Sequence, residues 1–580
     1  MVDTTPKNWF IPSVPFTEGN SVVALVDGSD FMKHLYERLM QMGNADELFY
    51  SAWRASPGQT LRPDLKDVDT RLQPVLLELV KRGVIVRILA WAVPLYSLMA
   101  WYLYNPLSWV IRGRVNPALQ HPKEQRSFVE EVRRAIAAKG SGGGAYLDDR
   151  LPLRASHHQK FIVLSIKGDY WAYVGGIDIA LDRWDNANHD SPKERQDEIL
   201  FAWHDVHCVI QGPAVKEIWS NFKDRWNDPT PPLRGNGPGS HERTNSIREV
   251  LNVPANRRGS INIQRLRTLA CGVYSFKQDG EKTSLQGINR AVDQAQHYIY
   301  IEDQYLWPCS TIDHLARAMR DRGVHVYLVL AKEYDLPVIA IAHYEMRRMV
   351  LATLRKAGGD KLVCCHLEQS GSSKQIYVHS KFMIVDDCFV AIGSTNVGLR
   401  SHTTDSELHV GLVDSDLIEG IIDGRKVQVC RFAKELRIRI WKEHLNVPDA
   451  ALLDPIAAKS QWPRQGEAGR PTKVHHAVYH SGDVPPRETT ISDWYNALKV
   501  IRDFLKQPQP LPNISRDELG LIDEAVQLFD RIGYPALEFG KWDLLLGPIW
   551  WTPTYGLKAR IIKLIQEKLM NLETKCSDQI

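Results

Sequence analysis

Residues 376–407, IYVHSKFMIVDDCFVAIGSTNVGLRSHTTDSE, contain the pattern that decides the fold. His379 and Lys381 are two apart in a run of β-forming residues, so in a strand their side chains share one face. The Asp-Asp pair that begins at Asp386 indicates a hairpin turn, and the return strand ends near Asn396. The stretch therefore predicts a hairpin that presents a histidine, a lysine and an asparagine at one end.

A second copy of this arrangement lies at residues 157–178, HHQKFIVLSIKGDYWAYVGGID. There His158 and Lys160 precede an apolar strand, a turn and an aromatic return strand that ends at a glycine pair. A single H-x-K pair arises easily by chance, and a histidine that only hydrogen-bonds at a strand end is the ordinary alternative. Two copies in one chain predict a duplicated half-domain.

The doubled motif resembles that of the phospholipase D superfamily, in which H-x-K-x-x-x-x-D precedes a G-S or G-G pair and an asparagine or aspartate. The copy that begins at His379 fits this pattern throughout. The first copy departs from it, because Ser165 replaces the motif aspartate and the spacing to the glycine pair is longer, with Asp169 as a candidate substitute. Asp386 is an odd number of residues from His379, so we interpret it as a hairpin residue that faces away from the catalytic side.

Helix and strand patterns recur in the same order in both parts of the chain. A strand around 48–53, a helical apolar stripe and an apolar strand at 84–91 are matched by strands at 298–307 and 324–331 with a helix between them. The alternation predicts an α/β fold with two duplicated α/β/α sandwich halves, mostly parallel sheets and a pseudo-twofold relation. The expected domains are a first half at 1–230, a linker at 231–258, a second half at 259–455 and a C-terminal helical region at 456–580.

The composition limits the partners and the cellular compartment that we expect for this protein. A net charge of +3, from 72 basic and 69 acidic side chains, is not that of a polyelectrolyte binder, so no nucleic-acid partner is expected. The eight cysteines show no C-x-x-C pair, as is typical of a reducing compartment. The first residues lack the pattern of a signal peptide, so we expect synthesis in the cytoplasm.

Residues 92–111, AVPLYSLMAWYLYNPLSWVI, form an apolar insertion rich in tryptophan and tyrosine. Pro94 and Pro106 interrupt it, and the strand before it belongs to the sheet, so no transmembrane span is expected. Two interpretations remain open, contact with lipid and burial as a hydrophobic cap. The same two interpretations, lipid docking and plain packing, apply to the aromatic segment at 541–555 in the C-terminal region.

The chemistry of a phosphodiester limits the catalytic groups. Its anionic oxygens repel charged nucleophiles, so the reaction needs a neutral nucleophile and fixed cations. A neutral imidazole meets the first need at physiological pH, and Lys160 and Lys381 meet the second, with Asn396 as a further donor. The resemblance suggests His158 as nucleophile and His379 as general acid and then base, although the sequence alone allows the reverse.

Two acids occupy matched positions, each two residues before a histidine on a predicted strand. Each catalytic imidazole needs an acceptor on its far nitrogen, and we expect Asp205 to orient His158 and Glu407 to orient His379. Ordinary surface or interstrand ion pairs are the alternative for both acids. Asp178 replaces the motif asparagine in the first copy and is left out of the catalytic set, because an unpaired carboxylate would repel phosphate.

Neither a metal nor another cofactor is expected. The sequence has no H-E-x-x-H motif or His/Cys ligand spacing, and the two lysines supply the charge that a metal would bring. The resemblance likewise implies metal-independent chemistry. The predicted catalytic residues are His158, Lys160, His379, Lys381, Asn396, Asp205 and Glu407, of which Lys160, Lys381 and Asn396 would also bind substrate.

The leading hypothesis is a phospholipase D that hydrolyses membrane phospholipids to phosphatidic acid through a phosphohistidine. The segments WHDVH (203–207) and YIYIEDQYLW (298–307) also resemble the family. The alternatives are a phosphodiesterase that acts on DNA or RNA and a non-catalytic membrane-binding protein. The retention of His158 and Lys160 argues against the last.

The chain further resembles bacterial phospholipase D effectors that are delivered by type VI secretion. This resemblance implies a phospholipid membrane as substrate, an immunity protein and the secretion machinery as partners, and a non-classical export route to the membranes of neighbouring cells. The internal duplication is compatible with a monomer.

Overall fold

The computed structural model describes residues 2–92, 117–148, 150–151, 155–190, 202–229, 246–248, 251–254, 258–332, 337–372, 374–463 and 473–476. Contacts within the chain divide it into two compact units. The first unit comprises residues 1–306, 311–333 and 353–477, and the second comprises 307–310, 334–352 and 478–580. Both H-x-K motifs therefore lie in the first unit.

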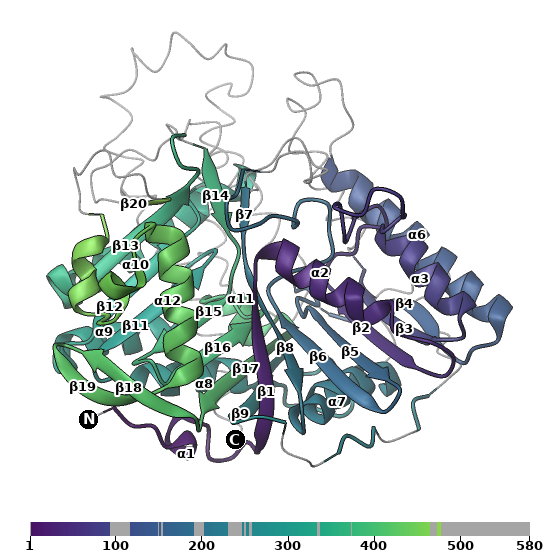
Figure 1. Cartoon of the computed structure of the whole chain (residues 1–580), viewed down its shortest axis with the longest axis horizontal. Helices are drawn as coiled ribbons and strands as arrows, with labels where there is room; N and C mark the ends of the chain where they lie inside the picture. The colour runs from purple at the N-terminus through teal and green to yellow at the C-terminus, as the bar shows by residue number, and fades with distance from the viewer. Residues whose placement is uncertain are drawn as a thin grey trace, which may run out of the picture. The chain divides into compact units, whose positions relative to one another are not determined.

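The first half of this unit is built on one sheet with the strand order β4-β3-β2-β5-β6-β8-β1 (Figure 1). Strands β2, β3 and β4 are parallel, and the remaining neighbours are antiparallel. The strands are β1 (Phe16–Val26), β2 (Glu47–Ala52), β3 (Ile85–Trp91), β4 (Gly144–Asp148), β5 (Phe161–Ile166), β6 (Asp169–Gly175) and β8 (Val206–Gln211).

The second half repeats this order as β13-β12-β11-β15-β16-β17-β9. Again three strands are parallel and the rest antiparallel, so each strand has a counterpart in the first half. The strands are β9 (Ile261–Leu269), β11 (Tyr298–Asp303), β12 (His325–Leu330), β13 (Leu362–Glu368), β15 (Phe382–Val385), β16 (Phe389–Gly393) and β17 (Glu407–Asp414).

Two strand pairings join the halves. The start of β1 pairs with β9, while its end pairs with β8, so β1 belongs to both sheets (Figure 1). In addition, β7 (Ala202–His204) of the first half pairs in parallel with β14 (Gln375–Val378) of the second. The backbone just before His379 therefore lies against the backbone just before Asp205.

The α/β fold with duplicated halves is confirmed. The sheets are mixed, however, and contain fewer parallel neighbours than the sequence predicted. Within each half, parallel pairing is confined to three strands, because each H-x-K segment opens a hairpin that adds antiparallel neighbours.

The helices cover these sheets with apolar faces. In α2 (Asp27–Leu39), Phe31, Leu35 and Leu39 recur at a spacing of four, and all three are buried in the core of the first half. This helix packs on β1 and β8, whereas α3 (Leu72–Lys81) and α6 (Pro117–Lys139) pack together over β3. A fourth helix, α7 (Ala214–Asn227), contacts β6, β8 and β9.

The remaining described elements complete the chain. The helices are α1 (Pro6–Trp9), α8 (Thr283–Gln294), α9 (Ser310–Arg322), α10 (Pro337–Gly358), α11 (Leu399–Thr403) and α12 (Arg431–Leu445), with 3₁₀ turns at Gly359–Lys361, Asp449–Leu452 and Ala457–Gln461. The strands are β10 (Glu281–Lys282), the hairpin β18 (Leu417–Ile422) and β19 (Arg425–Cys430), and β20 (Val474–His476), which pairs with β13. Nearly all of the apolar insertion at 92–111 lies outside the described residues, as does the predicted C-terminal helical region beyond residue 476. Among the described helices, none is both long and apolar enough to cross a bilayer.

Asp386 is a hairpin residue, as predicted. It lies in the left-handed region with a φ of 52°, and its carboxylate accepts the backbone N–H groups of Gln296, His297 and Tyr298 at 2.6, 2.9 and 2.7 Å. These bonds tie the β15–β16 hairpin to the turn before β11. The side chain therefore has a structural role in the second half.

In the first half the equivalent carboxylate comes from the opposite side. Asp46, in the turn before β2, accepts the N–H of Lys167 in the β5–β6 hairpin and that of Gly43, both at 2.8 Å. Asp169, the substitute proposed from the sequence, instead pairs with Arg258 and is 56% exposed. The loss of the motif aspartate at Ser165 is therefore compensated by Asp46, and the assignment of Asp169 was wrong.

These contacts predict unequal effects on stability. Asp386→Ala and Asp46→Ala each remove a carboxylate that satisfies backbone N–H groups, and each should lower the free energy of unfolding by about 2 kcal/mol. Asp169→Ala removes only an exposed ion pair and should change it by less than about 0.5 kcal/mol. Urea unfolding followed by tryptophan fluorescence measures the three effects. A large loss in Asp169→Ala with none in Asp46→Ala would restore the first assignment.

Candidate active site

The two H-x-K segments are short loops that lead into equivalent strands. His158 and Lys160 immediately precede β5, and His379 and Lys381 immediately precede β15. In each copy the lysine ammonium donates to the carbonyl of the histidine two residues before it, at 2.8 Å for Lys160. This contact holds each ammonium beside its own histidine.

Backbone hydrogen bonds place each loop against the other half. The N–H of His158 donates to the carbonyl of Ser406 at 2.9 Å, and that of His379 donates to the carbonyl of His204 at 2.8 Å. Ser406 and His204 immediately precede Glu407 and Asp205, the two acids at matched positions in the two halves. Each catalytic loop is thus aligned with the acid of the opposite half.

The side chains follow this crossed alignment. Nδ1 of His158 lies 3.1 Å from both carboxylate oxygens of Glu407, and Nδ1 of His379 lies 2.7 Å from Oδ2 of Asp205. The expectation that Asp205 orients His158 and Glu407 orients His379 is therefore wrong. The partners are exchanged because β7 pairs with β14 and Ser406 pairs with the segment before His158.

The two acids are held differently. Glu407 accepts the hydroxyl of Ser394, whereas Gly176 stands at the equivalent position of the first half. A Cβ atom at Gly176 would lie only 2.1 Å from Oδ1 of Asp205, so a side chain there would displace the carboxylate. The G-G pair of the first copy and the G-S pair of the second therefore each fit their own acid.

The asparagine position also differs between the copies. Asp178 accepts the backbone N–H groups of Trp53 and Arg54 at 3.1 and 3.0 Å, and its second oxygen lies 3.4 Å from the ammonium of Lys160. It is therefore paired, as a carboxylate near a phosphate site must be. Asn396 donates to Asp303 at 3.2 Å, which fixes the orientation of its amide.

Burial and the two lysines set the protonation of the site. The pKa values of His158 and His379 both lie well below the usual value, first because the rings are buried and then because Lys160 and Lys381 are close to both. Both imidazoles are therefore neutral. With the Nδ1 proton on the acid side, each Nε2 carries the free lone pair that a nucleophile or a base needs.

Burial also shifts the pKa values of the charged groups around the rings. It raises the pKa of Asp205 to about 6 and that of Glu407 to about 7, and it lowers the pKa of Lys381 to about 8. An anion bound between the lysines would raise the pKa of Lys381 again, because it stabilises the ammonium form. The charge distribution of the free site therefore favours the binding of a negatively charged group.

Sequence reasoning missed three side chains that border the rings. The Arg183 guanidinium lies 3.8 Å from the ring centroid of Trp203, and its charge contributes to the lowered pKa of His379. The Trp203 ring lies 4.9 Å from the His379 ring, and the Trp53 ring lies 5.9 Å from the His158 ring. Arg183 lies in a loop without hydrophobic periodicity, so no sequence pattern marked it.

Family profiles match both parts of this site. The profile described as "Phospholipase D" matches residues 61–321, and the profile described as "Cardiolipin synthase, PLD-like domain" matches residues 288–423. The first covers the H-x-K copy at His158 and the second the copy at His379. The chain belongs to the phospholipase D superfamily.

Curated relatives carry the same family name. Phospholipase D1 of Mus musculus is 27% identical over 363 residues, which cover 53% of this chain and 32% of its own length. Phospholipase D alpha 3 of Arabidopsis thaliana is 23% identical over 564 residues, which cover 75% of this chain and 66% of its own length. The aligned part of this chain thus spans about a third of the mouse enzyme. Among solved structures, the phosphatidylserine synthase of Haemophilus influenzae Rd KW20 is similar over 69% of this chain and 84% of its own, with 13% identity and a TM-score of 0.45.

The lowered pKa of Lys381 predicts pH-dependent anion binding. Sulfate keeps its charge across the range, so its affinity should fall as Lys381 loses its proton, by about fivefold between pH 8 and pH 9. Lys381→Arg keeps the positive charge and should abolish this dependence. Isothermal titration calorimetry with sulfate measures both. An equal fall in wild type and in Lys381→Arg would assign the effect to another group.

Proposed function

We propose that this chain is a phospholipase D that hydrolyses the head-group phosphodiester of membrane phospholipids to phosphatidic acid. The observation that carries the proposal is the pair of neutral imidazoles, each held by the acid of the opposite half and flanked by two lysines. Hydrolysis of a phosphodiester through a phosphohistidine needs these groups. They are a neutral nucleophile, a second imidazole for proton transfer and fixed cations.

In the proposed reaction, Nε2 of His158 attacks phosphorus and forms a phosphohistidine while the bond to the leaving oxygen breaks. His379, protonated when the anionic substrate is bound, donates its proton to that oxygen. It then removes a proton from the attacking water, which cleaves the phosphohistidine and releases phosphatidic acid. The head-group alcohol is released in the first step, so atoms and charges balance.

Lys160 and Lys381 would neutralise the phosphate oxygens throughout these steps. Asn396 would donate one amide N–H to the substrate while the other is held by Asp303. Asp205 and Glu407 would keep the Nδ1 proton of each ring in place and stabilise each imidazolium as it forms. These roles assign a step to every residue in the predicted catalytic set.

Aromatic side chains beside His158 support a lipid substrate. Trp53 and Trp91 stack with their centroids 5.8 Å apart, and both are partly exposed. Such amphipathic rings are suited to the boundary between a polar head group and an acyl chain. The curated relatives named phospholipase D support the same substrate class.

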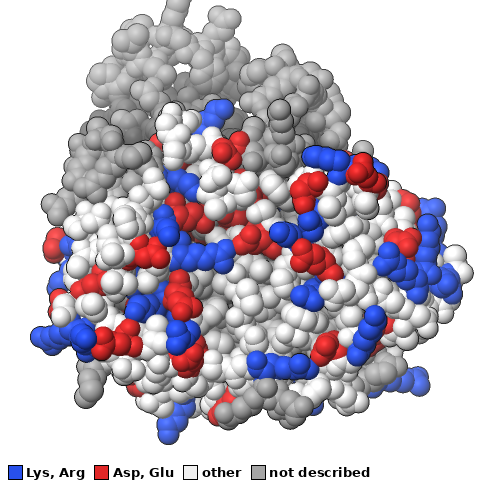
Figure 2. All heavy atoms as spheres, in the orientation of Figure 1, with Lys and Arg blue, Asp and Glu red and all other residues white. Residues whose placement is uncertain are grey.

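A nuclease-like phosphodiesterase is the second candidate, because the same catalytic groups cleave any phosphodiester. On the face shown in Figure 2, Lys and Arg side chains are interspersed with Asp and Glu, and no continuous basic field follows the surface. Nucleic-acid binding depends strongly on such a field. We therefore rank this candidate lower.

We further propose that the protein acts as a secreted antibacterial effector of the type VI route, paired with an immunity protein. The support is the sequence resemblance described above. Lipid damage in neighbouring cells that depends on the secretion system and is prevented by a co-expressed immunity protein is the observation that would test this role.

The substrate class can be tested with purified protein. Incubation with phosphatidylcholine or phosphatidylethanolamine vesicles should release head group and phosphatidic acid, which mass spectrometry detects. His158→Ala and His379→Ala should each reduce turnover by at least about a thousandfold, since each removes an essential group. Supercoiled plasmid is the matched alternative substrate. Plasmid cleavage without lipid turnover would favour the nuclease, and near wild-type turnover in either variant would exclude the paired mechanism.

The order of the histidines can be tested by trapping the intermediate. A p-nitrophenyl phosphodiester has a leaving group that needs little protonation, so His379→Asn should still form a phosphohistidine but release it slowly. Peptide mass spectrometry should then find the phosphoryl adduct on His158. The reciprocal variant His158→Asn is the control and should show no adduct. An adduct on His379 in the control would reverse the two roles.

A further inference from the structure

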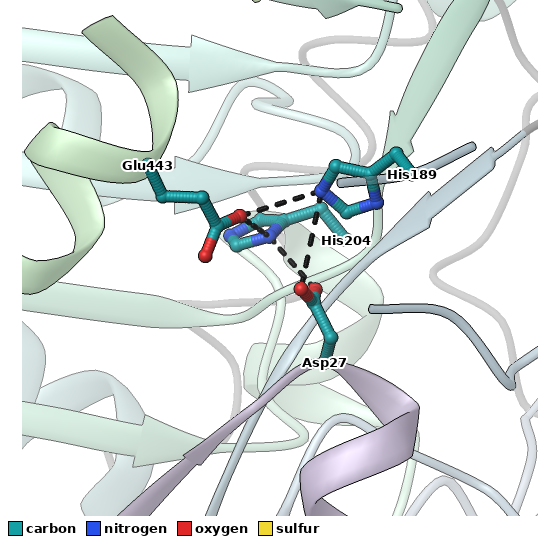
Figure 3. A group of neighbouring side chains, drawn as sticks. All are labelled: Asp27, His189, His204 and Glu443. Carbon is teal, nitrogen blue, oxygen red and sulfur yellow. Dashed lines mark hydrogen bonds and ion pairs between the residues drawn. The ribbon is translucent and has the colours of Figure 1, made fainter. Parts of the chain in front are cut away.

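Four ionisable side chains meet in a buried cluster outside the phosphodiester site. Figure 3 shows Asp27, His189, His204 and Glu443 pointing toward one another. Asp27 begins α2, His189 lies in a loop, His204 ends β7 and Glu443 belongs to α12, so four separate segments converge. The first three are buried, and the Glu443 side chain is 9% exposed. The proposed mechanism uses none of them.

The spacing of these atoms fits a single metal ion. Nδ1 of His204 lies 3.0 Å from Oδ1 of Asp27 and 3.4 Å from Oε1 of Glu443. Nε2 of His189 lies 3.3 Å from Oε1 of Glu443 and 3.9 Å from Oδ2 of Asp27. Ligands at about 2.0–2.1 Å around a tetrahedral ion are themselves about 3.3 Å apart. The cluster therefore needs only small movements to coordinate such an ion.

The far nitrogen of each imidazole is directed toward a second carboxylate. Nε2 of His204 lies 3.0 Å from Oε2 of Glu302, and Nδ1 of His189 lies 3.4 Å from Oδ2 of Asp185. Metal-ligating histidines usually have such an acceptor, which fixes the tautomer and turns the lone pair toward the metal. Glu302 thus orients the His204 ring for ligation, and Asp185 faces the far nitrogen of His189 without a hydrogen bond.

One carboxylate oxygen of the cluster makes no hydrogen bond within the described part of the chain. Oδ2 of Asp27 is buried and has no hydrogen-bond partner among the described residues. A buried carboxylate oxygen without a partner is costly, and here it faces the imidazole of His189 at a distance too long for a hydrogen bond. A cation at the centre of the cluster would satisfy this oxygen.

We propose that Asp27, His189, His204 and Glu443 bind one divalent transition-metal ion of the zinc class. Two imidazoles and two carboxylates suit Zn²⁺ or Mn²⁺, whereas Ca²⁺ and Mg²⁺ favour oxygen ligands alone. Two carboxylates would balance the ionic charge, with both imidazoles neutral. No sequence motif marks this site, because its ligands are separated by 15 to more than 200 residues.

The ion would position the second catalytic loop and take no part in the reaction. The carbonyl of His204 accepts the N–H of His379, and its neighbour Asp205 orients the His379 ring. Glu302, the acceptor of His204, also accepts the hydroxyl of Ser380 at 2.6 Å. The proposed ligand His204 is therefore adjacent to Asp205, and its acceptor Glu302 contacts Ser380, which lies between His379 and Lys381. Its existence does not depend on the proposed phospholipase activity.

The test is metal analysis of untagged, full-length protein. Wild type should contain or take up one equivalent of zinc, measured by plasma mass spectrometry and by calorimetry after chelator treatment. Zinc should also raise the melting temperature of the chelated protein. Glu443→Gln, which preserves shape, and His189→Ala should each bind zinc at least about tenfold more weakly and lose the zinc-dependent rise in melting temperature. Glu419→Gln, an exposed acid in β18, is the matched control and should behave as wild type.

Each outcome decides the proposal. Circular dichroism establishes that Glu443→Gln is folded, so a loss of zinc in that variant reports ligation. If folded wild type binds no stoichiometric zinc or manganese and its melting temperature is unchanged by either, the cluster is an ion-pair network held by protons and the proposal is wrong. Equal zinc binding by wild type, Glu443→Gln and His189→Ala would place the ion elsewhere and is equally contrary to it.

Discussion

The crossed pairing of carboxylates and imidazoles is the interaction on which the site depends. Asp205 holds His379 at 2.7 Å and Glu407 holds His158 at 3.1 Å, so neither half can orient its own histidine. Strand pairing enforces the exchange, because β7 lies against β14 and Ser406 lies against the segment before His158. The duplication thus yields one site that both halves must complete, and this requirement ties the chemistry to the packing of the two sheets.

The copies are similar in topology but differ in the side chains around their lysines and acids. Lys160 lies 3.4 Å from the carboxylate of Asp178, whereas the equivalent Asn396 is neutral and donates to Asp303, whose carboxylate acts on Lys381. The acids differ as well, since Glu407 accepts a serine hydroxyl and Asp205 lies against Gly176. The proposed mechanism gives the two imidazoles different steps, and these substitutions give them different surroundings on a shared backbone.

Much of the fold and of the site could be predicted from local patterns. Strand alternation and the repeated H-x-K spacing predicted the duplicated α/β halves and the residues that the structure brings together. The exchange of Asp205 and Glu407 could not be predicted, because it depends on which strands pair across the halves and no local pattern encodes that pairing. The same limit explains Asp46, which replaces the motif aspartate from a turn more than 100 residues earlier in the chain.

Burial explains why these groups interact so strongly. Removing water from the two histidines and two lysines lowers the pKa of all four, and the same burial raises the pKa of both orienting acids. In the free site, burial therefore disfavours the charged forms of these lysines and histidines. A bound anionic phosphodiester would stabilise the ammonium and imidazolium forms again, because its charge is opposite to theirs. We therefore expect binding of the anionic substrate to be coupled to protonation of the second imidazole. In the proposed mechanism, the second imidazole would become an acid only when the anionic group that it protonates is bound.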